Sequence, residues 1–162
     1  MARPHLRLST EFGAVIIDPS EDDIVDVMAA LKPGDGPAFA ILAEDQDYGD
    51  YVQAAGGPDP ETGQPRYCIE RRRYERDDRG VIVSPDRYDH FAACIRDEAR
   101  PLGRTYITTN GFQVNVRTDE VLLLEDAIDV FNQFVESRDL PKQFTWRSNR
   151  ADVDRIGEIG RQ

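Results

Sequence analysis

The sequence has little that would tie it to a membrane or to secretion. No apolar run approaches the roughly 20 residues that a bilayer-spanning helix needs. The opening stretch, MARPHLRLSTEFG, contains no apolar core of the kind found in signal peptides, so we expect no secretory signal. Cysteine is also scarce, since Cys68 and Cys94 are the only two. Without an export signal, both are expected to be free thiols of a cytoplasmic protein.

The sequence also lacks the short motifs that identify many enzymes and nucleotide-binding proteins. It contains no G-x-S-x-G nucleophile elbow, no P-loop and no G-x-G-x-x-G fingerprint. His5 and His90 are far apart and belong to no cluster with metal-ligand spacing. Neighbouring arginines could lower the pKa of Cys68, but a structural thiol is the simpler interpretation. We therefore predict no enzymatic activity, no cofactor and no metal.

Negative charge is what the sequence has in excess, and it is concentrated in the first third of the chain. The net charge is −11. Between Glu11 and Glu61 there are thirteen acidic residues and one base, Lys32. The 101 residues after Glu61 carry 18 acids and 17 bases. Such a field repels nucleic acid and anionic lipid and attracts a basic partner, with acidity that serves only solubility as the alternative.

Hydrophobic periodicity predicts about three amphipathic helices. The first covers residues 21–31, after a capping-box pattern of Ser20 and Asp23. The second would begin at Pro85, after Ser84, and place these residues on one face: Tyr88, Phe91, Ala92, Ile95 and Ala99. The third covers residues 123–138 and carries the strongest apolar stripe: Leu124, Ala127, Ile128, Phe131, Phe134 and Val135.

The remaining ordered segments are predicted to be strands. Their expected ranges are 13–18, 39–43, 51–55, 66–76, a hairpin over 104–118 and a last strand at 143–147. Asn110 and Gly111 form the two-residue turn of that hairpin. These elements predict an α+β fold, a mainly antiparallel sheet with the helices packed mostly on one face. We expect one domain over residues 1–147, followed by a charged, frayed tail over 148–162.

An acidic turn between two of these strands, EDQDYGD, raises the possibility of a metal site. Asp45, Asp47 and Asp50 resemble the start of a calcium-binding EF-hand loop. That loop needs an oxygen ligand at its fifth position, glycine at its sixth and glutamate at its twelfth. Here these positions hold Gly49, Asp50 and Gly56. The mismatch predicts a strand-turn-strand unit whose paired glycines, Gly56 and Gly57, make a tight turn.

Two stretches resemble immunity-protein family one of bacterial polymorphic toxin systems. The first is YVQAAGG, residues 51–57, followed by the charged strand YCIERRR. The second is a long helix, LLEDAIDVFNQFVESRDLP, that leads into KQFTW, with Phe131, Phe134 and Trp146 at the aromatic positions of the family. The similarity extends from Phe39 to Trp146. The segment Gly80–Gly103 and the residues after Trp146 depart from the family pattern.

The resemblance implies a cytoplasmic antidote that binds the toxic domain of a cognate secreted toxin and blocks it. Toxins of this class include nucleic-acid deaminases and nucleases, whose substrate clefts are basic, so an acidic protein could cover them. The partner is then a basic toxin domain, with no direct binding of nucleic acid and no membrane association. The expected partner-binding residues are those of the acidic turn and the following strand: Glu44, Asp45, Asp47, Tyr48, Asp50, Tyr51 and Gln53.

Other interpretations stay open at this point. The acidic turn could be a solvated hairpin tip without a partner. Trp146 is expected to pack in the core rather than touch a partner, and the arginines from Arg71 to Arg73 are expected to form a solvated strand face. The alternative function is a small enzyme or ligand-binding sensor with a pocket between sheet and helices, and a generic interaction module is a third possibility.

Overall fold

The computed structural model describes residues 2–95 and 103–150. Within these residues the chain forms nine strands, two α-helices and a short 3₁₀-helix. The strands are β1 (Leu6–Thr10), β2 (Val15–Ile17), β3 (Phe39–Glu44), β4 (Tyr51–Pro58), β5 (Pro65–Tyr74), β6 (Tyr88–Cys94), β7 (Arg104–Thr108), β8 (Gln113–Arg117) and β9 (Thr145–Ser148). The helices are α1 (Glu21–Ala29), the 3₁₀-helix η1 (Thr118–Glu120) and α2 (Leu124–Ser137).

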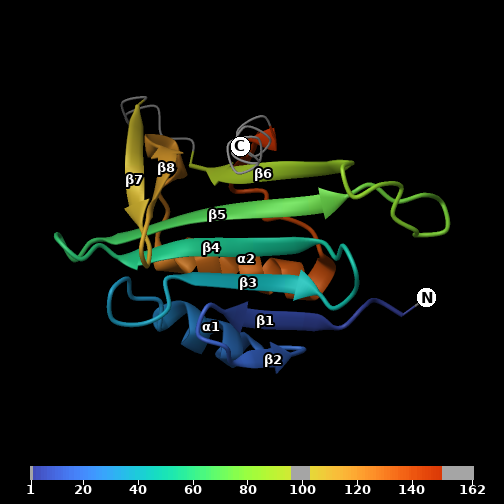
Figure 1. Ribbon diagram of the computed structural model, residues 1–162, viewed down its shortest axis with the longest axis horizontal. Helices are drawn as coiled ribbons and strands as arrows, with labels where there is room; N and C mark the ends of the chain where they lie inside the picture. Colours follow the sequence, from blue (N-terminus) through green and yellow to red (C-terminus); the bar gives the residue numbers. More distant parts are fainter. Residues whose placement is uncertain (1, 96–102, 151–162) are drawn as a thin grey trace.

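Seven of the strands form one antiparallel sheet in the order β2-β1-β3-β4-β5-β6-β9, and β7 pairs with β8 in a separate hairpin. Figure 1 shows α2 behind the middle strands of the sheet and α1 beside β1 and β2. The α+β class and the mainly antiparallel sheet are thus confirmed. The expected number of helices is wrong, since the described residues contain two α-helices rather than about three.

The two helices form where both periodicity and capping agree. At the start of α1, Ser20 accepts a hydrogen bond from the Asp23 N–H and Asp23 accepts one from the Ser20 N–H, which confirms the capping box. At the start of α2, the Asp126 carboxylate accepts a hydrogen bond from the Leu123 N–H. α2 ends at Ser137, and the next residue, Arg138, has a left-handed backbone (φ 63°) that closes the last turn.

One hydrophobic core joins both helices to one face of the sheet. It contains Ile24 and Met28 of α1, Phe131 and Phe134 of α2 and side chains from the sheet: Leu6, Leu8, Ala40, Leu42, Val52, Ala54, Tyr67, Ile69 and Ala93. Because side chains alternate along a strand, the intervening residues lie on the opposite face. That opposite face is covered at one end by the β7–β8 hairpin, through Ile107 and Val116 against Cys68.

The helix expected from Pro85 does not form, and the residues from Tyr88 to Cys94 are strand β6 instead. Ser84 accepts a hydrogen bond from the Asp86 N–H, so it caps a turn rather than a helix. β6 lies between β5 and β9, and four of its seven residues are buried on the two faces. A strand buried on both faces has no simple alternation, so its apolar residues can imitate a helical stripe. Ala99, part of the expected stripe, lies outside the described residues.

The paired glycines do not make a turn, because Gly56 and Gly57 lie inside β4. Both are buried, with φ of 117° and 146°. A Cβ atom on Gly56 would lie 2.1 Å from the Arg66 carbonyl oxygen and 2.8 Å from Ile107 Cγ2. One on Gly57 would lie 2.7 Å from the Leu31 carbonyl oxygen. The two glycines therefore allow the β7–β8 hairpin and the segment after α1 to approach β4 closely.

The first two strands and the C-terminal boundary differ from the expected elements. β1 has no counterpart among the expected strands, and β2 is shorter than the expected 13–18. The boundary expected after residue 147 falls within β9, and Asn149 is buried; residues 151–162 of the expected tail lie outside the described residues.

Within the described part of the chain, neither α-helix combines the length and the hydropathy that a membrane crossing requires.

Candidate functional site

The sheet face opposite the helices carries a group of polar and aromatic side chains, which we call the polar sheet face. Its members are Tyr51 and Gln53 of β4, Glu70, Arg72 and Tyr74 of β5, and Tyr88 and His90 of β6. Cross-strand pairing brings them together, since Tyr51 is opposite Arg72, Arg72 is opposite His90, and Tyr74 is opposite Tyr88. Such pairs are neighbours on one face of an antiparallel sheet.

Arginine and tyrosine side chains stack on one another in the polar sheet face. The Arg72 guanidinium lies 4.1 Å from the centre of the Tyr88 ring, and the Arg150 guanidinium lies 3.7 Å from it. Tyr74 makes ring contacts with both Tyr88 and Tyr48. Cation–π contacts of this kind hold the rings in fixed orientations. The result is a preorganised surface of aromatic rings with polar edges, a composition that is common in protein interfaces.

His90 connects β6 to the residues after β9. It is 2% exposed, and its Nδ1–H donates to the Asn149 Oδ1 atom at 2.6 Å. Its Nε2 atom lies 3.4 Å from Glu70 Oε2, and Glu70 also accepts a hydrogen bond from Gln53 Nε2 at 2.9 Å. His90 is therefore a buried histidine within strand β6. Through Glu70 of β5, which also binds Gln53 of β4, His90 of β6 links three neighbouring strands.

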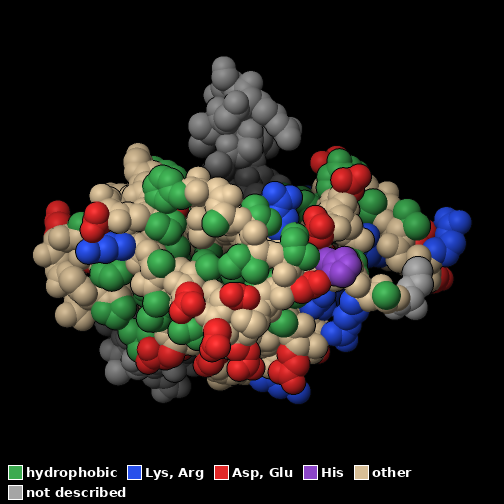
Figure 2. All heavy atoms as spheres, turned by 90° about the horizontal axis from the view of Figure 1, so that it is seen from below, with side chains coloured by type: hydrophobic (Ala, Val, Ile, Leu, Met, Phe, Trp, Pro, Cys, Tyr) green, Lys and Arg blue, Asp and Glu red, His purple; other side chains and the backbone are tan. Residues whose placement is uncertain are grey.

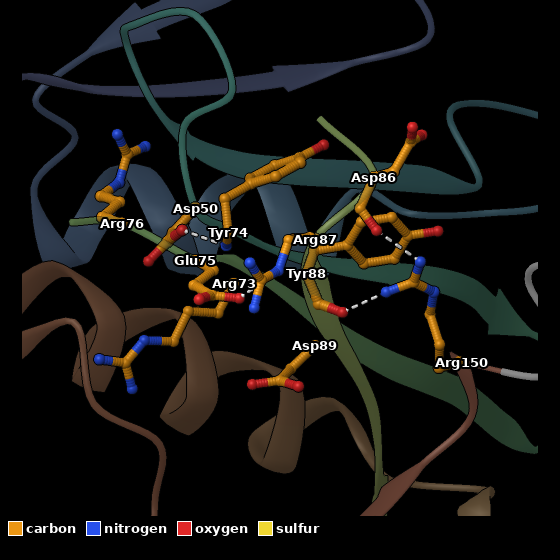
Figure 3. Close-up of a pocket in the computed structure, with 10 residues that line it drawn as sticks. All are labelled: Asp50, Arg73, Tyr74, Glu75, Arg76, Asp86, Arg87, Tyr88, Asp89 and Arg150. Carbon is orange, nitrogen blue, oxygen red and sulfur yellow. Dashed lines mark hydrogen bonds and ion pairs between the residues drawn. The ribbon is translucent and has the colours of Figure 1, made fainter. Parts of the chain in front are cut away.

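Next to the polar sheet face lies an open pocket of about 620 Å³ at the end where β5 leads to β6 (Figure 3). Arg150 donates to the Tyr88 and Asp86 carbonyl oxygens, and Arg87 forms an ion pair with Glu75 at 2.8 Å. The pocket is lined by four acids, four arginines and two tyrosines: Asp50, Arg73, Tyr74, Glu75, Arg76, Asp86, Arg87, Tyr88, Asp89 and Arg150. With four arginines among four acids, it has no strong preference for an anion or a cation.

The predicted partner-binding residues fall into three groups, and the first of these is internal. Glu44 accepts a hydrogen bond from the Asp50 N–H at 3.2 Å and lies 3.9 Å from Arg138 Nε. Burial raises the pKa of Glu44, against the lowering effect of Arg138. The Asp50 carboxylate accepts a hydrogen bond from the Tyr74 N–H at 2.9 Å. Both carboxylates therefore hold the turn to its neighbours.

The second group is exposed at the tip of the turn. Asp45 and Asp47 are exposed, and the Tyr48 side chain is 47% exposed while its ring contacts Tyr74. The backbone beneath them is fixed, because the Tyr48 carbonyl oxygen accepts a hydrogen bond from Arg76 Nη2 at 2.7 Å. These three residues are therefore exposed on a turn whose backbone is held in place.

The third group, Tyr51 and Gln53, belongs to the polar sheet face. Both side chains are half-buried. Burial raises the pKa of Tyr51 to about 12, so its hydroxyl stays neutral and can both donate and accept hydrogen bonds at physiological pH. The structure thus connects the exposed turn to the polar sheet face through the neighbouring rings of Tyr48, Tyr74 and Tyr88.

One cluster of potential metal ligands occurs in the described part of the chain, formed by Cys94, Asp119 and Glu120. Arginines already compensate its charge: Arg117 donates to Asp119 at 2.8 Å, and Arg147 donates to Glu120 at 2.6 Å. Burial raises the pKa of the Cys94 thiol, and the two carboxylates raise it further. A metal would have to displace these ion pairs and a proton, so the cluster is better described as an ionic link between η1, β8 and β9. The acids of the turn are not part of it.

Several other sequence-based expectations can be compared with the structure. Cys68 and Cys94 are free and buried, and burial raises the pKa of Cys68, so the arginines nearby do not activate it. Trp146 packs against the core, as expected, and its Nε1–H donates to the Pro141 carbonyl oxygen. The expectation of a solvated arginine face is wrong for Arg71, which is 8% exposed on the helix side of the sheet.

The sequence reasoning missed Arg72, Tyr74, Tyr88 and Arg150 as a group. Tyr74 and Arg72 have the two-residue spacing of one strand face, which is a visible signal. Tyr88 was assigned to a helix, and Arg150 to the frayed tail. Because their contacts cross three strands, only the strand order and register bring these four residues together.

Acidic side chains gather along the edge of the molecule where α1, β1 and β2 lie. Figure 2 shows acidic side chains concentrated there, with hydrophobic side chains between them. The exposed acids of this region include Asp18 after β2, and Glu21, Asp22 and Asp26 of α1. The charge asymmetry of the sequence therefore becomes an asymmetry of the surface.

Comparison with models of known protein families gives no match, and no curated protein matches this chain. The resemblance to immunity-protein family one therefore stays a prediction based on the two motifs described above.

Proposed function

We propose that the chain is an immunity protein that binds the toxic domain of a cognate secreted bacterial toxin and blocks it. The partner is a basic protein domain that acts on nucleic acid, such as a deaminase or a nuclease, and the complex forms in the cytoplasm. The observation that carries this proposal is the acidity of the first third of the chain, where nine of the thirteen acids between Glu11 and Glu61 are exposed and the one base is Lys32.

The geometry supports binding through a preformed surface. The exposed side chains of Asp45 and Asp47 supply charge that steers a basic partner, and Tyr48 supplies a fixed aromatic ring. Asp50 and Glu44 hold the backbone that presents them. A surface that is already ordered loses little conformational entropy on binding, which favours a tight complex.

The described residues also favour a blocking mechanism over a catalytic one. The thiols of Cys68 and Cys94 are buried with raised pKa values, so neither is an activated nucleophile. The ring of His90 is held between Asn149 and Glu70. An antidote without turnover must act in a fixed molar ratio to its toxin.

A small enzyme or ligand-binding sensor is the second candidate, and the open pocket of about 620 Å³ is the observation in its favour. That pocket lies at the β5–β6 end, whereas the space between sheet and helices is filled by core side chains such as Phe131, Phe134 and Leu42. The three arginines Arg76, Arg87 and Arg150 already have protein partners. The pocket therefore offers few uncommitted groups for a substrate.

Co-expression with a candidate toxin domain, taken from a gene that neighbours the gene of this chain, tests the proposal. We expect the chain to restore growth and to co-purify with the toxin domain as a complex of fixed ratio. Replacing Asp45 and Asp47 by asparagine should slow association and weaken its salt dependence, because two steering charges are removed at constant shape.

The matched control removes two exposed charges on α2, by Glu125→Gln and Asp129→Asn. This variant should associate at a rate close to that of the wild type. Failure of the wild-type chain to bind or to protect would refute the proposed function. Equal effects of the two double variants would show that net charge alone, and not the turn, governs association.

A further inference from the structure

A second candidate contact surface lies at the opposite edge of the sheet from β9, between α1 and the β1–β2 pair. It is an apolar groove of about 250 Å³ lined by Leu8, Ser9, Thr10, Ala14, Ile16, Asp26, Val27, Ala30 and Pro37. We call it the α1–β2 groove. A buried cavity of about 150 Å³ is already large enough for benzene, so this groove has room for one large apolar side chain.

Exposed hydrophobic side chains lie on the two elements that form the α1–β2 groove, although Val15 and Ile17 point to the sheet face opposite Ile16 and the groove. Val15 and Ile17 of β2 are 43% and 51% exposed, and Val25 of α1 is 41% exposed. Within the described residues β2 pairs with β1 alone, so it is an edge strand of the sheet. Apolar side chains that gather at an edge and are bordered by charge are typical of interaction sites.

The charge around the α1–β2 groove determines which partner it fits. Residues 11–35 contain seven acids and one base, Lys32. Asp26 lines the groove and Asp22 is exposed one helical turn before it. A second copy of this chain would bring the same acids into contact, and an anionic membrane would be repelled for the same reason. A positively charged segment has neither disadvantage.

We propose that the α1–β2 groove binds an extended segment of a basic partner, with one apolar side chain in the groove and flanking lysine or arginine side chains at Asp22 and Asp26. An extended segment suits this place because it can lie along the edge strand β2 and alternate its side chains. The inference rests on the proposed function, because the partner is the same toxin domain, held here at a second surface.

Peptide probes test the α1–β2 groove without the toxin. A fluorescein-labelled hexapeptide Lys-Val-Lys-Leu-Lys-Val is compared with Lys-Ser-Lys-Ser-Lys-Ser, which has the same charge and no apolar anchor. Fluorescence anisotropy should show that the first binds about ten-fold tighter or better, the gain expected from burying one large apolar side chain. Equal affinity for the two peptides would overturn the proposal.

A groove-filling substitution shows where the peptide binds. Ala30 lines the groove, is exposed and lies at the end of α1, so Ala30→Phe can fill the groove without entering the core. This variant should lose the preference for the apolar peptide, whereas the control Ala30→Ser should keep it. Replacing Asp22 and Asp26 by asparagine should weaken the binding of both peptides. An unchanged preference in Ala30→Phe would place the peptide elsewhere and contradict the proposal.

The same variants separate this inference from the proposed function. If Ala30→Phe weakens binding of the toxin domain, the result supports both the proposed function and the inference about the α1–β2 groove. If the toxin domain binds Ala30→Phe as tightly as the wild type, the inference is wrong and the proposed function is unaffected. If the wild-type chain does not bind the toxin domain but keeps its ten-fold preference for the apolar peptide, the proposed function is wrong and the groove remains a peptide-binding site.

Discussion

At the scale of single residues, carboxylates that look alike in the acidic turn have different roles. Asp50 is half-buried and accepts a hydrogen bond from the Tyr74 N–H, which ties the start of β4 to the end of β5. Asp47 is exposed at the tip of the same turn. The first stabilises the fold, and the second is available to a partner.

We therefore predict different costs for removing the two carboxylates. Asp50→Ala should lower the free energy of unfolding by about 1–3 kcal/mol, because it leaves the Tyr74 N–H without its acceptor. Asp47→Ala should change it by no more than about 0.5 kcal/mol, as for most surface substitutions. Urea denaturation measures both values, and equal effects would contradict the assigned roles.

His5 and Asp18 form a pair that crosses from the start of β1 to the end of β2. The His5 Nδ1 and Asp18 Oδ2 atoms are 2.5 Å apart. The hydrogen bond to Asp18 raises the pKa of His5, and the Asp18 charge adds to this effect. The Leu6 N–H and then His5 lower the pKa of Asp18. The His5 contribution to stability is complete below the ordinary histidine pKa and is lost as the pH rises through the raised pKa of His5. The Asp18 contribution is complete above the ordinary aspartate pKa and is lost as the pH falls through the lowered pKa of Asp18, so the pair stabilises the fold most between these two limits.

An NMR titration can measure this pair, because the chain has two histidines. The His5 ring signal should give a pKa above about 6.5, the ordinary value for histidine. Asp18→Asn should bring it back toward that value, and asparagine tolerates the left-handed backbone (φ 49°) at this position. A pKa of His5 that does not change in this variant would mean that the pair does not form in solution.

At the scale of elements, the sequence predicts best where a local signal is strong. α1 and α2 combine an apolar stripe with a capping carboxylate, and both form where expected. β6 does not follow from the sequence, because burial on both faces removes the alternation that marks a strand. The polar sheet face cannot be predicted from the sequence either, because its residues are brought together by the register of β4, β5 and β6.

The β7–β8 hairpin depends on a glycine in β4 for its close approach. Replacing Gly56 by alanine should reduce the free energy of unfolding by about 1–3 kcal/mol more than Gly63→Ala does. Both glycines have positive φ (117° and 71°), but nothing lies within 4 Å of a Cβ atom at Gly63. The difference between the two variants therefore combines the contact with Arg66 and Ile107 and the larger distance of the Gly56 φ from the left-handed helical region.

Thermal or urea unfolding of both variants measures that difference. Complete loss of cooperative unfolding in Gly56→Ala alone would agree with a large steric cost. Equal destabilisation would show that backbone strain, and not the approach of the hairpin, explains why β4 contains glycine here.

At the scale of the whole molecule, the acidic third of the sequence becomes one side of the structure. Its acids extend from the α1–β2 edge to the turn before β4. The sequence predicts this excess of negative charge, because charged residues can be counted without knowledge of the fold. It does not separate carboxylates that serve the fold, such as Glu44 and Asp50, from those that face solvent, because that distinction arises from contacts with Arg138 and Tyr74.

A titration of toxin activity with increasing amounts of this chain tests the central claim most directly. A blocking antidote should lower the activity of the toxin domain in proportion to its amount and abolish it at a fixed molar ratio, when the toxin concentration is far above the dissociation constant. Complete inhibition by a small fraction of that amount would indicate turnover, and full toxin activity in an excess of the chain would show that it is not the antidote.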